Sequence, residues 1–188
     1  MQDNKIVVMG IDPSTSHLGH SKLIYDIKKQ RTITETYGCF SATDLARKYS
    51  KQEVKEYGNI ISLFQCEQEI ERIVDDYQPD FVVSESPFVY RFPQAFASLC
   101  LCVNAIQRAL YKTNRKLYLI APRQAKKAIG NSMAGKEEVQ EAIHHLPDLK
   151  IIHTKEKPKA AMVEHEADSI AIAYAFIHQV LPELLKTN

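Results

Sequence analysis

The sequence predicts an α/β domain in which helices flank both faces of a mixed five-stranded sheet. Three short apolar segments follow one another near the N-terminus, and helical and strand-like patterns then alternate to the C-terminus. Strands that follow one another directly usually pair antiparallel, whereas strands separated by a helix usually pair parallel. The length of 188 residues suits one domain, and we expect residues 1–188 to form a single domain.

The first three strands are predicted from apolar and alternating runs. Lys5–Ile11 is an apolar run rich in β-branched residues, and Pro13 ends it directly after Asp12. Residues 18–26 and 32–40 alternate more weakly, and a charged, turn-like KKQR joins them. This pattern predicts an antiparallel hairpin after the first strand.

Helices and strands alternate through the rest of the chain. In chain order we expect a helix at 52–77, a strand at 80–85, a helix at 94–113, a strand at 116–120, a short helix opened by Pro122, a helix from Gly135, a mobile loop at 148–159 and a last helix at 163–185. The helix at 94–113 is apolar over much of its circumference, so we expect it to be buried on more than one side.

Composition excludes several classes of protein. Apolar residues make up 45% and charged residues 25%, as in globular proteins, and no apolar run approaches the length of a membrane span. The N-terminal MQDNK lacks the features of a secretory signal, so we expect a cytoplasmic protein (cytosol or nucleoid, or host cytoplasm if viral). The four cysteines lie far apart or on apolar faces, which favours reduced core thiols over a metal site.

Basic residues are unevenly distributed although the net charge is only +1. From Ser86 to Lys136 there is no Asp or Glu, while nine Lys and Arg residues fall in that stretch. A segregated basic block favours a polyanion-binding surface, because each neutralised phosphate releases condensed counterions. The alternative is a solvated surface on which basic residues cluster by chance.

Two predicted strands end in a carboxylate that a proline follows within two residues. Asp12 closes the first strand and Glu85 the fourth, so both acids project from one sheet edge if these strands are parallel neighbours. A carboxylate at the end of an apolar strand is costly unless it is paired, solvated or bound to a cation. The last helix adds His165 and Asp168, three residues apart, where the helix becomes apolar. Such a set can hold Mg²⁺ or Mn²⁺, and two such ions commonly serve phosphodiester hydrolysis.

Each of these residues also has a structural interpretation. Asp12 could cap a turn in DPSTS, and Glu85 could pair with Arg91 or Arg123. A single histidine such as His165 is more often an ordinary surface or core residue than a ligand. Two further acids near the start of the last helix are most simply solvated charges, namely Glu164 and Glu166.

Four segments, in this order along nearly the whole chain, resemble the motifs of the RuvC family of Holliday-junction resolvases, which have an RNase H-like fold. The segments are GIDPSTSHLG at 10–19, SESPF at 84–88, APRQAKKAIGNSMAGKEEV at 121–139 and HEADSIAIA at 165–173. The resemblance implies an endonuclease that resolves four-way or branched DNA by two-metal-ion hydrolysis with paired symmetric nicks.

The resemblance also implies roles for individual residues. The catalytic and metal-binding positions of the family fall on Asp12, Glu85, His165 and Asp168. The implied cofactor is Mg²⁺, two ions per active site, with Mn²⁺ able to substitute; an imidazole in place of an acid should shift the preference towards Mn²⁺. The implied DNA-binding positions are an aromatic residue at the junction centre and basic residues along the scissile strand, namely Phe88, Arg123, Lys126, Lys127 and Lys136.

The implied partner is a four-way junction, whose two-fold symmetry is most simply matched by a C2 homodimer. We expect the apolar helix at 94–113 to form the dimer interface, its alternative being an ordinary central helix. Phe88 has a comparable alternative as a core residue.

Other functions remain compatible with the sequence. One is another RNase H-like nuclease that acts on RNA/DNA hybrids or on RNA. A sugar-kinase or actin-like ATPase also has a first strand that ends in Asp before a Ser/Thr-rich turn, but it normally needs two such domains. A junction-binding protein without catalysis would not require Asp12, Glu85 and Asp168 together.

Overall fold

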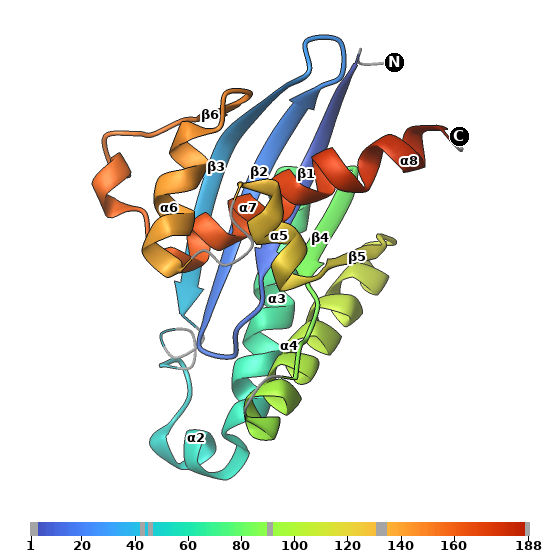
Figure 1. Cartoon of the computed structure of the whole chain (residues 1–188). Helices are drawn as coiled ribbons and strands as arrows, with labels where there is room; N and C mark the ends of the chain where they lie inside the picture. Colours follow the sequence, from blue (N-terminus) through green and yellow to red (C-terminus); the bar gives the residue numbers. More distant parts are fainter. Residues whose placement is uncertain (1–3, 42–43, 45–46, 90–91, 131–134, 187–188) are drawn as a thin grey trace.

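The computed structural model of the chain describes residues 4–41, 44, 47–89, 92–130 and 135–186 (Figure 1). Six strands form one sheet in the order β5-β4-β1-β2-β3-β6. Their bounds are β1 (Lys5–Asp12), β2 (His17–Asp26), β3 (Arg31–Ser41), β4 (Phe81–Glu85), β5 (Leu117–Ile120) and β6 (Leu149–Ile151). The first three strands pair antiparallel as a meander, and β4, β5 and β6 run parallel to the strands they join.

The expected sheet of five strands was wrong by one, because β6 lies in the segment 148–159 that the sequence assigned to a mobile loop. β6 is only three residues long and stands among lysines, so it carries no alternating pattern of its own. Its strand conformation is stabilised by parallel pairing with Thr32–Thr34 of β3 and by the burial of Leu149. A turn follows in which Thr154 and Lys157 exchange backbone hydrogen bonds at 3.2 Å.

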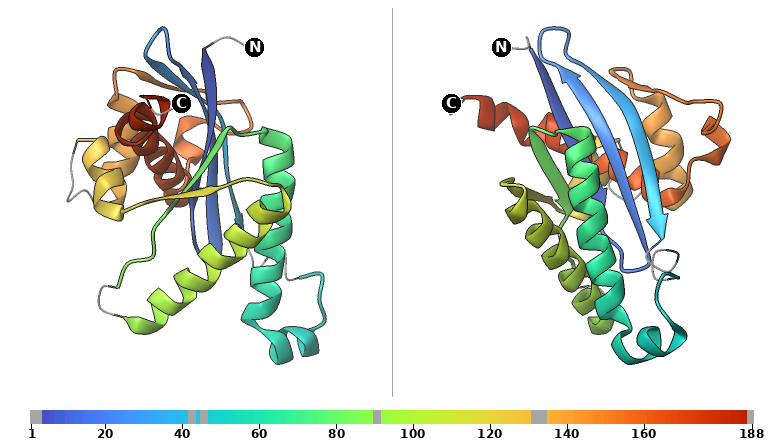
Figure 2. Two further views of the ribbon diagram at one scale, coloured as in Figure 1. Left: turned by 90° about the vertical axis from the view of Figure 1, so that its right-hand side faces the viewer. Right: turned by 180° about the vertical axis from the view of Figure 1, so that it is seen from behind.

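Helices cover both faces of the sheet, as predicted. They are α2 (Lys51–Tyr57), α3 (Asn59–Tyr77), α4 (Pro93–Lys112), α5 (Pro122–Ala128), α6 (Lys136–His145), the 3₁₀ helix η1 (Lys159–Ala161), α7 (Glu164–Gln179) and α8 (Leu181–Lys186). The helices α3 and α4 pack together on one face, while α5, α6 and α7 lie on the other (Figure 2). No helix in the described part of the chain is both long and apolar enough to cross a membrane.

Two helices predicted as continuous are broken. The helix at 52–77 is interrupted at Gly58, whose φ of 42° lies in a region that L side chains rarely adopt. The helix at 163–185 is interrupted at Val180, two residues before Pro182. A proline lacks the N–H that continues a helix, and its ring clashes with a preceding carbonyl.

Side chains of the sheet alternate between two cores. On β1, Val8 belongs to the core that the sheet shares with α5, α6 and α7. Met9 and Ile11 belong to the other core, beneath α3 and α4. Because successive strand residues point to opposite faces, Asp12 points towards the face that α7 covers. That face also receives the most buried helix, since every residue of α7 in the range 169–177 is buried.

Candidate active site

The ends of β1 and β4 bring two carboxylates to the same level and the same face of the sheet. The two strands are parallel, with Ile11 opposite Ser84, so Asp12 and Glu85 come next in register on neighbouring strands. Val83 belongs to the core on the α7 face, and Glu85, two residues later, shares its direction. The predicted meeting of the two strand-end acids is thus found in the structure.

Two glycines let α7 approach the sheet closely enough to add its own side chains. A Cβ on Gly10 would lie 2.1 Å from the carbonyl oxygen of Ser169, and a Cβ on Gly19 would lie 1.9 Å from that of His165. Both obstacles are backbone atoms of α7, so no side chain at these positions fits the present packing. The first turns of α7 therefore rest directly on β1 and β2.

His165 reaches Asp12 from the first turn of α7. Its Nδ1 lies 2.6 Å from Asp12 Oδ2, and its ring stacks at 6.0 Å on that of His17 at the start of β2. The hydrogen bond to Asp12 raises the pKa of His165, and partial burial opposes this shift. The structure therefore brings His165 to the first strand-end carboxylate, 153 residues away in the sequence.

Glu85 and Asp168 stand in a negatively charged environment that disfavours their ionisation. Burial, followed by the charges of Asp12 and Asp168, raises the pKa of Glu85 from 4.5 to about 7. Burial, followed by the charges of Asp12 and Glu164, raises the pKa of Asp168 from 3.8 to about 7. The positive charge of Lys126 lowers both values without offsetting these effects. The effects of burial and of the neighbouring acids on these two carboxyls thus outweigh that of Lys126.

The carboxylates line two adjoining hollows that have Glu85 and Pro122 in common. One, of about 250 Å³, is also lined by Asp12 and Phe88. The other, of about 210 Å³, is also lined by Lys126, Glu164 and Asp168. Glu85 therefore stands between the strand-end acid and the acids of α7.

The donor set fits a divalent cation by its chemistry. Among the described residues, no group of three or more His, Cys, Asp or Glu side chains is already arranged so that it could hold a metal ion. Half-buried carboxylates with raised pKa values are nevertheless what a hard cation needs, since oxygen ligands and excess negative charge favour its binding. Asp12, Glu85 and Asp168, with His165 as a nitrogen donor, are the residues that could hold such an ion.

The raised pKa values predict how the metal-free protein responds to pH. Between about pH 4.5 and about pH 7 these two carboxyls bind more protons in the folded chain than in the unfolded chain, so their contribution to the free energy of unfolding falls as pH rises. Glu85→Gln removes one of these carboxyls, and we expect its stability in EDTA to fall less over this window. Urea unfolding of both proteins from about pH 5 to about pH 8 measures the difference. Parallel curves would contradict the raised pKa of Glu85.

Of the predicted DNA-binding residues, Phe88 and Lys126 line these hollows. Phe88 is 57% exposed, so it is not a core residue, and it lines the same hollow as Asp12. On α5, Lys126 is half-buried beside the carboxylates, while Arg123 and Lys127 are exposed. Lys136 is the first residue of α6, and its side chain lies outside the described residues.

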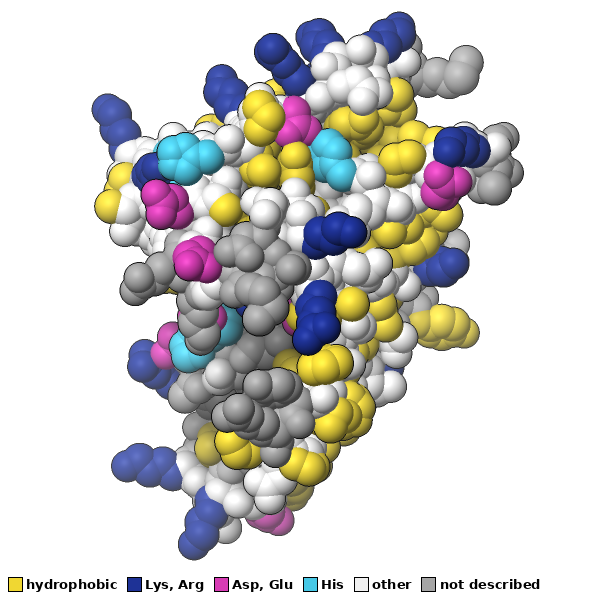
Figure 3. All heavy atoms as spheres, in the orientation of Figure 1, with side chains coloured by type: hydrophobic (Ala, Val, Ile, Leu, Met, Phe, Trp, Pro, Cys, Tyr) yellow, Lys and Arg dark blue, Asp and Glu magenta, His cyan; other side chains and the backbone are white. Residues whose placement is uncertain are grey.

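Several described basic residues of the block 86–136 make contacts within the protein and are not free to bind phosphate. Arg108 and Lys112 of α4 bind the buried carboxylate of Glu67 on α3, at 2.5 and 2.6 Å. Arg115 donates to the carbonyl oxygen of Pro79. On the face shown in Figure 3, Lys and Arg side chains are spread widely rather than gathered in one patch. Part of the block thus serves to join α4 to its neighbours, which a one-dimensional charge count does not reveal.

The acids and the residues near them differ in how far they follow their structural interpretations. The hydroxyl oxygen Oγ of Ser14 accepts the backbone N–H groups of Ser16 and His17 in the β1–β2 turn, both at 3.3 Å. Among the described residues no ion pair joins Arg123 to Glu85, and Arg91 lies outside the described part of the chain. The assignment of Glu166 to a solvated charge was wrong, because its side chain is 3% exposed.

Three features of the site were missed by sequence reasoning. Glu164 lines a hollow with Asp168 and raises its pKa, although it reads as an ordinary first-turn acid. Gly10 and Gly19 decide how closely α7 approaches, and their placement at both ends of the GIDPSTSHLG segment was the available signal. The third is the burial of Glu166, which no local pattern indicates.

Comparisons with known proteins agree on one family. The family model described as "Crossover junction endodeoxyribonuclease RuvC" matches residues 8–178. The crossover junction endodeoxyribonuclease RuvC of Protochlamydia amoebophila is 28% identical over 98% of this chain and 97% of its own length. That of Finegoldia magna is 28% identical over 90% of this chain and 92% of its own length.

Solved structures of the same kind share the fold. Thermus thermophilus RuvC is 25% identical and superposes with a TM-score of 0.66, covering 92% of this chain and 93% of that one. The yeast mitochondrial Holliday junction resolvase Ydc2, 13% identical, has a TM-score of 0.64 over 90% of this chain and 77% of its own. The predicted α/β fold of the RNase H-like type is therefore confirmed, with six strands in place of five.

Proposed function

The chain belongs to the RuvC family of crossover junction endodeoxyribonucleases, and we propose that it resolves four-way DNA junctions by paired, symmetric nicks. The observation that carries this proposal is the convergence of Asp12, Glu85 and Asp168, from three separate elements, at one sheet edge with two raised carboxyl pKa values. A Thermus thermophilus relative has been solved in complex with a Holliday junction substrate, which supports the same substrate class here.

RuvC-family nucleases are metal-dependent, and we propose two Mg²⁺ ions for this chain, with Mn²⁺ able to substitute. Asp12 would contribute to both sites, with His165 and Asp168 on one side and Glu85 on the other. Such ions activate the attacking water and stabilise the leaving oxygen. The residues themselves supply the oxygen and nitrogen donors, and the imidazole of His165 makes the set favourable for Mn²⁺.

We propose that DNA binds across α5 and the loop after β4. Lys126 lines a hollow with Glu85 and Asp168, and Arg123 and Lys127 are exposed on the same helix, so these cations can hold a phosphate backbone beside the reacting bond. The exposed ring of Phe88 is available to stack on or wedge between bases at the crossover. We assign Lys136, at the start of α6, to the same track.

The double variant Lys126→Ala, Lys136→Ala should bind junctions more weakly and with a smaller salt dependence. Each phosphate contact contributes a slope of about −0.9 in the logarithm of affinity against that of salt, so losing two should reduce the slope by about two. Binding titrations at several salt concentrations in EDTA measure it. A slope equal to that of the wild type would remove both lysines from the phosphate track.

We further propose a homodimer, since two equivalent sites match the symmetry of the junction. Helix α4 is the candidate interface. Its inner face is buried against α3 and the sheet, while Leu101 and Tyr111 on it are 52% and 86% exposed. Apolar side chains also gather on the α4 and β5 side of the face shown in Figure 3. We take residues 1–188 as one nuclease domain, which acts on DNA in the cytoplasm.

Substrate preference tests the proposed function. Purified protein with Mg²⁺ is offered a mobile four-way junction, a linear duplex of the same sequence and an RNA/DNA hybrid, each labelled on every strand. We expect symmetric nicks in opposite strands of the junction and little cleavage of the other two. Preferential cleavage of the hybrid would assign the chain to RNA/DNA processing, and binding of the junction without any nick would exclude catalysis.

A further inference from the structure

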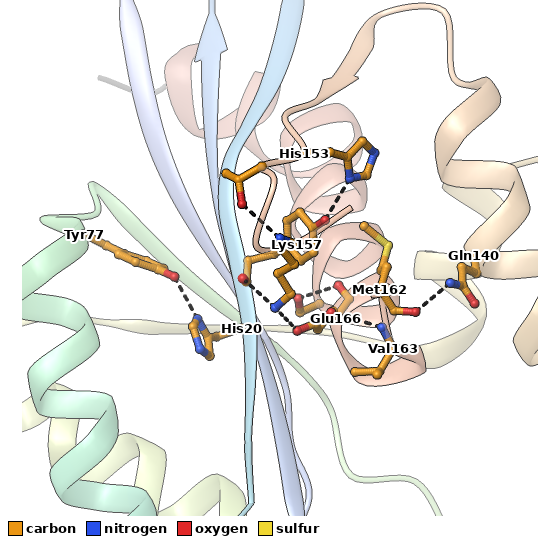
Figure 4. Close-up of polar contacts among 11 residues, drawn as sticks. His20, Tyr77, Gln140, His153, Lys157, Met162, Val163 and Glu166 are labelled. Carbon is orange, nitrogen blue, oxygen red and sulfur yellow. Dashed lines mark hydrogen bonds and ion pairs between the residues drawn. The ribbon is translucent and has the colours of Figure 1, made fainter. Parts of the chain in front are cut away.

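A buried ion pair fastens the segment that leads into α7. Glu166 is 3% exposed, and the ammonium of Lys157 donates to its Oε1. Lys157 comes from the turn after β6, and its ammonium also donates to the backbone carbonyl of Tyr37 on β3 at 3.1 Å. The pair thus joins three segments that are distant in the sequence, namely β3, the turn after β6 and the first turn of α7 (Figure 4).

The same carboxylate caps α7. Its second oxygen, Oε2, accepts the backbone N–H of Val163 at 3.0 Å, directly before the helix. The N–H groups at a helix start lack partners within the helix, and the valine side chain has no atom that accepts a hydrogen bond. Glu166 is therefore the residue that defines where α7 begins, and Lys157 is the residue that makes its burial tolerable.

Further contacts hold Lys157 and the chain around it. The ammonium lies 4.8 Å from the centre of the Tyr37 ring, whose hydroxyl is 2.8 Å from His153 Nδ1. From α6, the amide of Gln140 donates to the carbonyl of Met162 at 2.8 Å. The route from β6 to α7 is thus fixed by side chains on two sides, as Figure 4 shows.

This arrangement bears directly on the carboxylate site. Glu166 stands between His165 and Asp168 in the sequence, and all three belong to the first two turns of α7. His165 meets Asp12 at 2.6 Å only while the helix start keeps its place on β2. A shift of the first turn would move both α7 donors relative to the donors on β1 and β4.

We propose that Lys157 and Glu166 are positioning residues of the metal centre, an inference that rests on the proposed function. The pair sets the place of the first turn of α7, and with it the separation of His165 and Asp168 from Asp12. Without Lys157, the charge of the buried Glu166 carboxylate has no compensating partner, so the side chain must turn towards solvent. That movement releases the N–H of Val163 and loosens the helix start.

Three variants test the inference. Lys157→Met keeps the apolar stem and removes the charge. Glu166→Gln keeps an oxygen for the Val163 N–H, and the double variant has neither charge. Lys186→Met is the matched control, since Lys186 pairs with Glu183 at 2.7 Å on the exposed helix α8. The readouts are Mn²⁺ affinity by calorimetry, junction affinity in EDTA, and the Mn²⁺ concentration that gives half-maximal cleavage.

We expect Lys157→Met to weaken Mn²⁺ binding about tenfold, as loss of a supporting residue around metal ligands typically does. The double variant should be less affected than Lys157→Met alone, because no uncompensated charge remains, and Lys186→Met should match the wild type. Junction affinity in EDTA should stay near that of the wild type in all of them.

Unchanged Mn²⁺ affinity in Lys157→Met would overturn the inference and leave the pair a purely structural one. A loss of junction affinity in EDTA equal to the loss of cleavage would make Lys157 a phosphate contact instead. Should Lys157→Met not fold, Glu166→Gln carries the test, and wild-type Mn²⁺ affinity in it refutes the idea. A wild-type protein that neither binds Mn²⁺ nor cuts junctions would refute the proposed function itself.

Discussion

Asp12→Asn should lower the rate of junction cleavage by about 10³-fold, on the scale of removing a central charge from a catalytic site. Asp12 adjoins every other member of the site. Its Oδ2 lies 2.6 Å from His165 Nδ1, and its side chain lines a hollow with Glu85. Its charge contributes to the raised pKa values of Glu85 and Asp168. Asparagine keeps the size of the side chain and removes its charge, so the strand end keeps its shape.

The comparison needs single-turnover cleavage at saturating Mg²⁺ together with junction binding in EDTA. Binding should stay within about threefold of the wild type, because phosphate contacts rather than the acids hold the DNA. Asp76→Asn is the matched control, as this exposed aspartate pairs with Arg72 on α3 far from the sheet edge. An undiminished cleavage rate in Asp12→Asn would show that the active site lies elsewhere.

Gly19→Ala should both destabilise the protein and abolish cleavage. The added Cβ would lie 1.9 Å from the carbonyl oxygen of His165 and 2.4 Å from its carbonyl carbon. These are backbone atoms, so a rotamer change cannot relieve the overlap and the first turn of α7 must move. Overpacking of a tight interior costs about 1–3 kcal/mol, and we expect the upper end of this range. Because the same movement displaces His165 and Asp168, the cleavage rate should fall by more than the loss of folded protein explains.

Gly135→Ala is the control for this prediction. Its Cβ would meet nothing closer than 3.9 Å, and its φ of −74° suits any residue. Urea unfolding gives the change in free energy, and Mn²⁺ calorimetry on the folded fraction reports whether the α7 donors still meet those of β1. A Gly19→Ala protein with wild-type stability and Mn²⁺ affinity would show that α7 does not rest on β2 as described.

Much of the fold follows from local patterns. The apolar run of β1, the hairpin and the alternation of helix and strand each leave a pattern of apolar and polar residues that is visible in the sequence. The misassigned parts lack such a signal. Leu149–Ile151 is a strand only because β3 lies beside it, and the break at Gly58 depends on a backbone angle that a helical pattern does not record. Pro182 was a local signal for the second break, and the helical period ran past it.

The candidate site was predictable where acidic residues end strands, and less predictable where the burial of a side chain determines its role. Asp12 and Glu85 were placed at one edge because parallel strands in register bring their ends together. His165 lies beside Asp12 as expected, since this contact requires only that α7 packs on the face of the sheet towards which Asp12 points. The roles of Glu166 and of Arg108 and Lys112 on α4 depend on partners 9 to 45 positions away in the sequence, which composition does not identify.

The most direct test of the central claim is to locate the metal. Crystals grown with Mn²⁺ should show anomalous scattering peaks among Asp12, Glu85 and Asp168, at about 2.0–2.3 Å from their carboxylate oxygens, the distance that such ions adopt. Soaking with Mn²⁺ should leave the corresponding position of Asp12→Asn weak or empty. Strong peaks elsewhere on the chain, with none at these carboxylates, would contradict the site proposed here.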